Sequence, residues 1–102
     1  MITKNLVKKN CIIFVFDITD RKSFEFIIND LYPQIKNLVD NNSIRVLIGN
    51  KLDLKYKRVI SNEEIDKFAD DNNLKYFEIS AKSGENFERF CNYVYNSFSK
   101  QI

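Results

Sequence analysis

Glycine, proline, histidine and tryptophan are scarce or missing in this sequence, which has two glycines, one proline, no histidine and no tryptophan in 102 residues. Two isolated glycines cannot form the run Gly-x-x-x-x-Gly-Lys-Ser/Thr, which cradles phosphate groups. Without histidine, the two cysteines have no partner for a mixed metal site. The sequence therefore contains neither a phosphate-binding loop of that kind nor a cysteine–histidine metal centre.

Cysteines are few, and long apolar runs and a large excess of one charge are lacking. Cys11 and Cys91 do not have the crowded spacing of a disulfide scaffold, so we expect buried thiols in a reducing compartment. No apolar run reaches the length of a membrane span and no signal-peptide core follows Met1, which predicts a soluble, cytoplasmic protein. The net charge of +2 comes from 16 basic and 14 acidic residues spread along the chain, which predicts no nucleic-acid partner.

What the chain does contain is a regular order of strand-like and helix-like segments. Strands are predicted where runs of mostly apolar residues occur, at 11–16, 45–48 and 75–79. Amphipathic helices are predicted where apolar residues recur at spacings of three and four, at 21–40, 62–72 and 87–98. This order predicts a single α/β domain over residues 1–102, with about three parallel strands flanked by helices.

Local signals predict how the helices begin and bend. Pro33 is expected to bend or divide the first helix, because proline has no N–H for the helix interior. Ser61 and Glu64 have the spacing of a capping box for the second helix, and Asn86 is expected to cap the third. We expect the apolar stripe of the third helix to be buried core; it consists of Phe87, Phe90, Cys91, Val94 and Phe98.

Asp17 ends the first apolar run and has two interpretations. A carboxylate at the end of a strand can hold Mg²⁺, but such a site also needs phosphates and a hydroxyl donor. Alternatively, Asp17 and Asp20 cap free backbone amides at the start of the next helix. The sequence favours the capping interpretation.

Two polar loops follow neighbouring predicted strands. Asn50-Lys51-Leu52-Asp53 comes after the second strand, and Ser80-Ala81-Lys82 comes after the third. Because ligands bind at the carboxyl ends of parallel strands, these loops are expected to form one recognition surface. They resemble the Asn-Lys-x-Asp and Ser-Ala-Lys motifs of the Ras-like small GTPases, and the segment from Asp17 to Glu25 resembles the Rab-like branch of that family.

The resemblance implies a truncated, Rossmann-like three-layer fold of the P-loop NTPase type and a site for the guanine base of GTP or GDP. Guanine presents N1–H and N2–H₂ side by side, and one carboxylate, that of Asp53, could accept both. Adenine has no such pair of donors, so Asp53 would be left without partners in an adenine complex. Guanine selectivity is therefore assigned to Asp53.

The same resemblance implies roles for five further residues. Asn50 would tie the two loops together and reach the N7 side of the base, and Lys51 would lay its aliphatic stem over the base plane. Ser80 would orient the recognition carboxylate, Ala81 would donate its backbone N–H to O6, and Lys82 would cover the other face of the base.

The sequence departs from the family in the parts that handle phosphate. The phosphate loop, the threonine-bearing switch segment and the Asp-x-x-Gly motif with its glutamine are missing. Mg²⁺ is therefore expected only in a full-length family member, and this chain alone is predicted not to hydrolyse GTP. Terminal cysteines for a prenyl anchor are also missing, so no direct membrane anchor is expected. Because residues 2–8 resemble the middle of the family's second helix, we expect residues 1–102 to be the second half of such a domain.

Three interpretations of the function remain open at this point. The chain is the base-recognition half of a Rab-like GTPase that serves vesicle trafficking and signalling, a non-catalytic interaction module or remnant, or an incomplete chain of a full GTP hydrolase. In the family's sheet order the strand Cys11–Phe16 lies next to the first strand, which is missing here. That strand is therefore expected to be an exposed edge that pairs with a protein partner or with a second copy of the chain.

Overall fold

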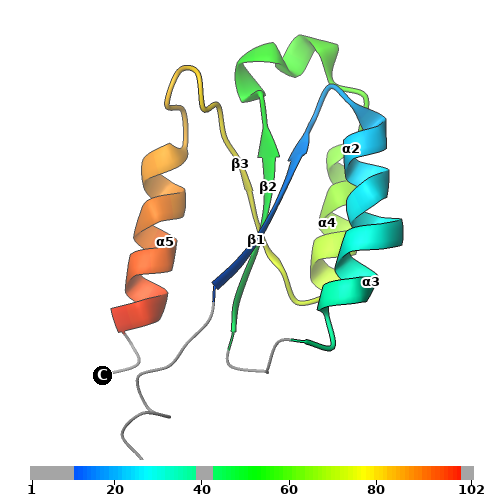
Figure 1. Ribbon diagram of the computed structural model, residues 1–102. Coiled ribbons are helices and arrows are strands. Elements are labelled where there is room, and N and C mark those ends of the chain that lie inside the picture. The colour runs from blue at the N-terminus through cyan, green and yellow to red at the C-terminus, as the bar shows by residue number, and fades with distance from the viewer. Residues whose placement is uncertain (1–10, 39–42, 100–102) are drawn as a thin grey trace, which may run out of the picture.

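The computed structural model describes residues 11–38 and 43–99, and three parallel strands in the order β1-β2-β3 form its centre. β1 spans Cys11–Asp17, β2 spans Ile44–Asn50 and β3 spans Lys75–Glu78. The last paired residues are Asp17 beside Asn50 and Gly49 beside Glu78. The three predicted strands are confirmed, and their carboxyl ends meet at one edge of the sheet, uppermost in Figure 1.

The α-helices that connect the strands cover one face of the sheet, and the short 3₁₀ segment after β2 lies beyond its carboxyl edge (Figure 1). Between β1 and β2 lie α2 (Arg21–Phe26), the π-helical turn η1 (Ile27–Leu31) and α3 (Tyr32–Ile35). Between β2 and β3 lie the 3₁₀ segment η2 (Leu52–Lys57) and α4 (Asn62–Asp71). We call this side of the sheet the crossover face; its buried residues are Phe14, Phe16, Ile18, Phe24, Ile27, Tyr32, Leu47, Ile60, Ile65, Ala69 and Leu74.

Pro33 was expected to bend or divide the first helical segment; it changes the hydrogen bonding there, but the backbone stays helical from Arg21 to Ile35. Since proline has no N–H, it cannot donate to the carbonyl of Asn29 four residues earlier. The helix is wider in the preceding turn, where the Tyr32 N–H donates to the carbonyl of Ile27 five residues back. Pro33 then lies in the first turn of α3, where a missing N–H costs little. The helix ends at Ile35, earlier than predicted; the expected end at 40 lies outside the described residues.

The predicted caps are confirmed at one helix and changed at another. The Ser61 side chain accepts a hydrogen bond from the Glu64 N–H at 3.1 Å, and α4 begins at Asn62. The Glu64 carboxylate does not return to Ser61 but pairs with Arg21 of α2, which links two helices of the crossover face. Asn86 was expected to cap the last helix; its side-chain nitrogen instead donates to the carbonyl of Glu78 at 2.9 Å and ties the helix to the end of β3.

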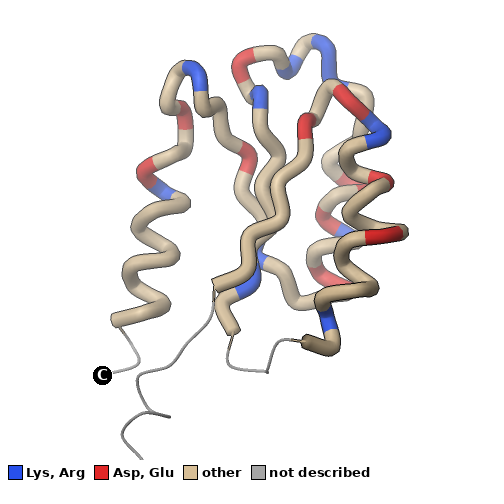
Figure 2. Tube along the Cα trace, viewed as in Figure 1, with Lys and Arg blue, Asp and Glu red and all other residues tan. Residues whose placement is uncertain are grey.

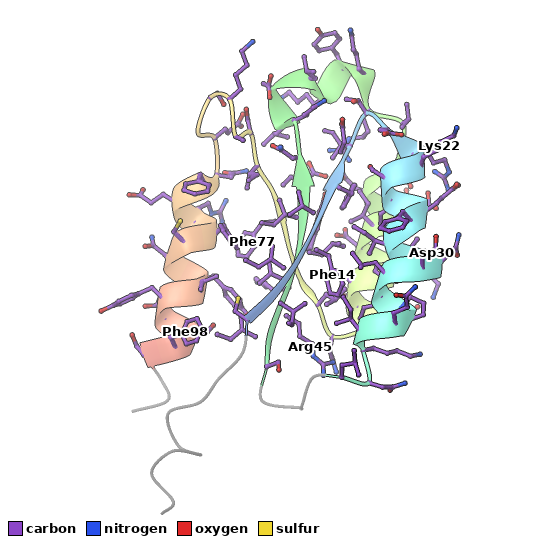
Figure 3. All side chains as sticks on the ribbon, viewed as in Figure 1. Phe14, Lys22, Asp30, Arg45, Phe77 and Phe98 are labelled. Carbon is purple, nitrogen blue, oxygen red and sulfur yellow. The ribbon has the colours of Figure 1, made fainter. Side chains whose placement is uncertain are left out.

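Among the described residues, the opposite face carries a single helix, α5 (Phe87–Ser99) (Figure 1). We call it the α5 face; Ile44, Val46, Ile48 and Ile79 are its buried residues. Phe14 points toward the helices of the crossover face, whereas Phe77 points toward α5 (Figure 3). There the Phe77 ring meets Phe90 and Tyr93, with ring centroids 5.9 and 5.6 Å apart.

The prediction of a buried stripe on α5 is wrong: three of its five members are exposed, and the other two, Phe90 and Val94, are only half-buried. Phe87 and Phe98 are 47% and 38% exposed, and Cys91 is also exposed. The helix is rotated so that its half-buried residues are instead Phe90, Tyr93, Val94 and Ser97. Two thiols were expected to be buried, but Cys91 is exposed and Cys11 is half-buried. The rotation follows from the contact of Tyr93 with Phe77, a contact that apolar spacing alone does not predict.

Charge is unevenly distributed over this architecture. Charged residues of both signs gather at the carboxyl edge of the sheet and on α2 and α4, whereas the second half of α5 contains none (Figure 2). Within the two described ranges, no helix has both the length and the apolar character needed to cross a bilayer.

Candidate functional site

The loop after β2 leaves the strand through a residue in the left-handed conformation. Lys51 has φ 74° and ψ 36°, which costs a residue other than glycine about 1 kcal/mol. The Asn50 side chain supports this turn, because its Oδ1 accepts from the Lys51 N–H at 2.8 Å and from the Ala81 N–H at 3.0 Å. Asn50 therefore joins the loop after β2 to the loop after β3, as the family resemblance implied.

The loop after β3 is anchored by Ser80, which is fully buried. Its Oγ donates to Oδ1 of Asp53 at 2.7 Å and accepts from the Ser83 N–H at 3.0 Å. Gly84, at φ 85°, closes this loop with a hydrogen bond from its N–H to the Ser80 carbonyl at 2.8 Å. Ser80 uses one of the about four acceptor positions of the Asp53 carboxylate. The carboxylate is thus oriented by the neighbouring loop and retains acceptor positions for a ligand.

Asp17, at the carboxyl end of β1, reaches the same place. Its Oδ1 accepts from the Thr19 N–H at 2.8 Å and from the Thr19 Oγ1 at 2.6 Å, and its Oδ2 lies 2.8 Å from Nζ of Lys51. Burial alone would raise the pKa of Asp17, but the hydrogen bonds from Lys51 and Thr19 outweigh it and lower this pKa below its ordinary value. The hydrogen bond that Lys51 donates to Asp17 in turn raises the pKa of Lys51.

The two interpretations of Asp17 can now be compared with its contacts. The side chain that caps α2 belongs to Asp20, whose Oδ1 accepts from the Lys22 N–H at 3.1 Å. The capping prediction is therefore confirmed for Asp20 and wrong for Asp17. As for the metal, the described residues contain no group of three or more Cys, Asp or Glu side chains that could hold an ion. Because Thr19 and Lys51 already bind both Asp17 oxygens, this donor set does not fit Mg²⁺.

The loops after β2 and β3 surround a hollow of about 260 Å³. It is lined by Asn50, Lys51, Asp53, Leu54, Ala81 and Lys82. Five of these six lining residues were predicted as site residues, and Leu54 was not. Ser80, the remaining predicted site residue, is fully buried and does not line the hollow. The arrangement offers one carboxylate, two lysine side chains and an apolar contact.

The sequence of this chain matches proteins of a known family. The family model described as Ras family matches residues 1–100. The chain belongs to the Ras family. Its open parallel sheet with flanking helices agrees with that family's α/β fold, so the chain forms a small-GTPase-related domain.

Among curated relatives of this Ras-family chain, two Ras-related Rab-13 proteins match 94 residues. The identity is 44% with the protein of Bos taurus and 40% with that of Mesocricetus auratus, over 89% of this chain and 42% of each relative. The Ras-related protein Rab-1 of Theileria parva is 40% identical over 78 residues, which are 76% of this chain and 36% of the relative. The chain thus spans about two fifths of the length of these relatives.

The sequence did not assign three residues that belong to the site. Leu54 lines the hollow, and Asp17 and Thr19 hold the tip of Lys51. A signal for the last two exists, because a threonine two residues after an aspartate is the spacing at which an Asp side chain accepts from the backbone ahead of it. That signal indicates a turn but cannot show which distant side chain the turn receives.

Proposed function

We propose that the hollow between the loops after β2 and β3 binds the guanine base of GTP or GDP. The observation that supports this most directly is the 2.7 Å hydrogen bond from Ser80 Oγ to Asp53 Oδ1, which holds a carboxylate at the hollow. The N1–H and N2–H₂ groups of guanine would both donate to that carboxylate. Adenine would leave it without donors, which costs on the order of several kcal/mol in a desolvated site.

The remaining wall residues suit the faces and edge of a purine. The Lys51 and Lys82 side chains line the hollow, and their aliphatic stems are the parts that would contact the two faces of the base. The Ala81 N–H donates to Asn50 at 3.0 Å, so O6 of guanine would share this donor. The base site would thus be formed before the ligand arrives, with Asn50 as the link between the loops.

We propose further that residues 1–102 are the second half of a Rab-like small-GTPase domain, cytoplasmic and serving the family's role in vesicle trafficking. The sequence has no Gly-x-x-x-x-Gly-Lys-Ser/Thr run, so the contacts that hold phosphates and Mg²⁺ would come from elsewhere. Without them, affinity for GDP would be weak, about millimolar or −4 kcal/mol. The chain alone would not hydrolyse GTP.

The test compares nucleotide selectivity of the wild type and an Asp53→Asn variant by NMR titration at high ligand concentration. The wild type should bind GDP more tightly than ADP. Asp53→Asn should shift preference toward xanthosine diphosphate, because the new amide offers a donor where xanthine has a carbonyl. Asp30→Asn, at an exposed position of η1, is the matched control and should change nothing. Equal binding of ADP and GDP by the wild type would refute the guanine site.

A second candidate function, association through β1, is favoured by a separate observation. Among the described residues β1 pairs with β2 alone, and Ile13 and Val15 on its outer edge are 42% and 55% exposed. The Ile18 N–H donates to the Asn50 carbonyl, so the backbone of Ile18 faces β2. Successive residues of a strand direct their N–H and C=O groups to opposite sides, so Ile13 and Val15, an odd number of residues away, direct theirs away from β2. We propose that this uncharged edge pairs with the same edge of a second copy.

Light scattering over a dilution series would test this association. The wild type should show a mass that rises with concentration, and Ile13→Lys should remain a monomer, because a charge at an edge strand opposes pairing. Leu38→Lys, at a residue 80% exposed and distant from β1 along the chain, is the control for the added charge alone. A wild type that stays monomeric at high concentration would exclude the β1 pairing.

A further inference from the structure

The tip of Lys51 is held by a residue that lies outside both recognition loops. Asp17 ends β1, and its Oδ2 lies 2.8 Å from Nζ of Lys51. We propose that Asp17 is a positioning residue of the base site: through this ion pair it holds the Lys51 side chain where its stem forms one wall of the hollow. The inference rests on the proposed guanine site and adds to it a residue from a third strand end.

Asp17 is itself held firmly enough to serve this purpose. Thr19 donates to its Oδ1 twice, from the backbone N–H at 2.8 Å and from Oγ1 at 2.6 Å. The Asp17 N–H donates to Ser23 Oγ at 2.9 Å, which fixes the backbone at the same residue. Because Thr19 binds Oδ1 of Asp17, the carboxylate has a fixed orientation, and its other oxygen, Oδ2, points toward the Lys51 ammonium. The turn between β1 and α2 therefore acts as a rigid support.

Lys51 needs such a support because half of its side chain is exposed. The exposed fraction is 50%, and a lysine stem with free rotation in solvent has many rotamers. Its backbone is fixed in the left-handed conformation by Asn50, and Asp17 fixes the opposite end of the side chain. With both ends held, the four-carbon stem between them has little freedom and lines the hollow.

Charge supports the same assignment. The Lys51 ammonium faces Asp17 from β1 and also lies within electrostatic range of Asp20 before α2 and of Asp53 on η2. Of these, Asp17 makes the direct contact, so it decides which way the ammonium points. Asp53 is thereby left for the ligand. Without Asp17, the ammonium would turn toward Asp53 and compete with guanine for its carboxylate.

The experiment is a double-mutant cycle of Asp17→Asn and Lys51→Met, with GDP affinity measured by NMR titration of the whole chain. Asp17→Asn should weaken GDP binding about three- to tenfold, the cost of ordering one long side chain on binding. In the Lys51→Met background, which keeps an apolar stem without the ammonium, Asp17→Asn should have no further effect. An equal loss in both backgrounds would overturn the proposal, because Asp17 would then act by another route.

A readout that a merely structural role would not change is the titration of Lys51 itself, followed through its ¹³Cε resonance. The pKa of Lys51 should be raised in the wild type and return to its ordinary value in Asp17→Asn. Thr19→Val removes one of the two hydrogen bonds that hold Asp17 and should weaken GDP binding by about half as much on a logarithmic scale. Thr19→Val is the alternative test if the Asp17→Asn variant does not fold. Unchanged affinity in Thr19→Val, with the Lys51 pKa also unchanged, would overturn the proposal.

Failure of this inference and failure of the base site give different results. If the wild type shows no preference for GDP over ADP, the base site is refuted and the role of Asp17 with it. If the wild type prefers GDP and Asp53→Asn loses that preference, the base site stands. An additive cycle of Asp17→Asn and Lys51→Met would then refute the role of Asp17 alone.

Discussion

The two faces of this sheet share the same three strands but are covered very differently. On the crossover face, Phe14 and Phe16 of β1 are 3% and 2% exposed, whereas on the α5 face Ile13 and Val15 of the same strand are 42% and 55% exposed. The helices of the crossover face connect consecutive parallel strands and must return across the sheet. Their face is therefore covered as a consequence of the topology.

The topology does not require the α5 face to be covered, because α5, the one helix that the described residues place there, follows the last strand and connects no two strands. The buried residues of this face are Ile44, Val46 and Ile48 of β2 and Ile79, which directly follows β3. The side chains in the middle of β1 that face this side stay exposed. The comparison teaches that a continuous apolar sequence shows that a strand is suited to burial on both faces, but not that both of its faces are buried. We expect the stability of the described residues to come mainly from the crossover face.

The largest expected effect is that of Phe24→Ala on the crossover face. Phe24 is fully buried and its ring meets Phe16 and Phe68, so its loss should lower the free energy of unfolding by about 3–5 kcal/mol. The same substitution on the α5 face, Phe87→Ala, should cost less than about 1.5 kcal/mol, because Phe87 is 47% exposed. Urea denaturation measures both, and equal losses would abolish the distinction between the faces.

Substitutions that add a single carbon atom should also affect stability differently on the two faces. A Cβ on Gly49 would lie 2.5 Å from Oη of Tyr76 and 2.9 Å from Ile18, so Gly49→Ala should destabilise the chain by about 1–3 kcal/mol. Val15→Ile on the α5 face adds one carbon in an exposed position and should be neutral to within about 0.5 kcal/mol. Tyr76→Phe in the Gly49→Ala background should recover part of the loss. If it recovers none, the crowding comes from Ile18.

The crossover face should also make stability depend on pH in the alkaline range. Burial, and then the hydrogen bond to Glu78 at 2.6 Å, raise the pKa of Tyr76 far above its ordinary value. Below the unfolded pKa of about 10, Tyr76 is neutral in both states and its contribution is complete. As pH rises above about 10, only the unfolded chain ionises there, so stability should fall by up to about 1.4 kcal/mol per pH unit.

Urea midpoints between pH 8 and pH 11, values that bracket the ordinary tyrosine pKa of about 10, would measure this dependence. Tyr76→Phe has no group to ionise at this position and should give a flatter profile. A Tyr76→Phe profile as steep as that of the wild type would assign the alkaline loss to other groups.

The smallest expected effect is that of Arg21→Ala, which removes the ion pair between α2 and α4. Arg21 and Glu64 have side chains 45% and 39% exposed, so solvent screens the pair and its loss should lower the free energy of unfolding far less than Phe24→Ala does. Lys67→Ala, which removes the more exposed pair with Asp71 within α4, is the matched control and should cost about 0.5 kcal/mol or less. A loss from Arg21→Ala as large as that from Phe24→Ala would show that charge, and not apolar packing, holds the crossover face together.

Most of the fold and five of the six residues that line the hollow could be predicted from the sequence. Strand and helix positions follow from spacing along the chain, and local chemistry fixes features such as the cap at Ser61 and the altered helix turn before Pro33. The two loops were placed together because parallel strands end at one edge, and the hydrogen bonds of Asn50 and Ser80 join them there. All of these signals lie within a few residues of one another or follow from the topology.

The sequence by itself determined which segments are strands and helices and which end of the sheet carries the polar loops, because backbone periodicity and turn chemistry act locally. Only the tertiary structure decided the rotation of α5 that half-buries Tyr93 and exposes Phe87 and Phe98, and the pairing of Lys51 with Asp17. Both depend on side chains from different elements meeting in space. One apolar stripe is compatible with several helix rotations, and one lysine with several carboxylates, so the packing of the assembled elements selects among them.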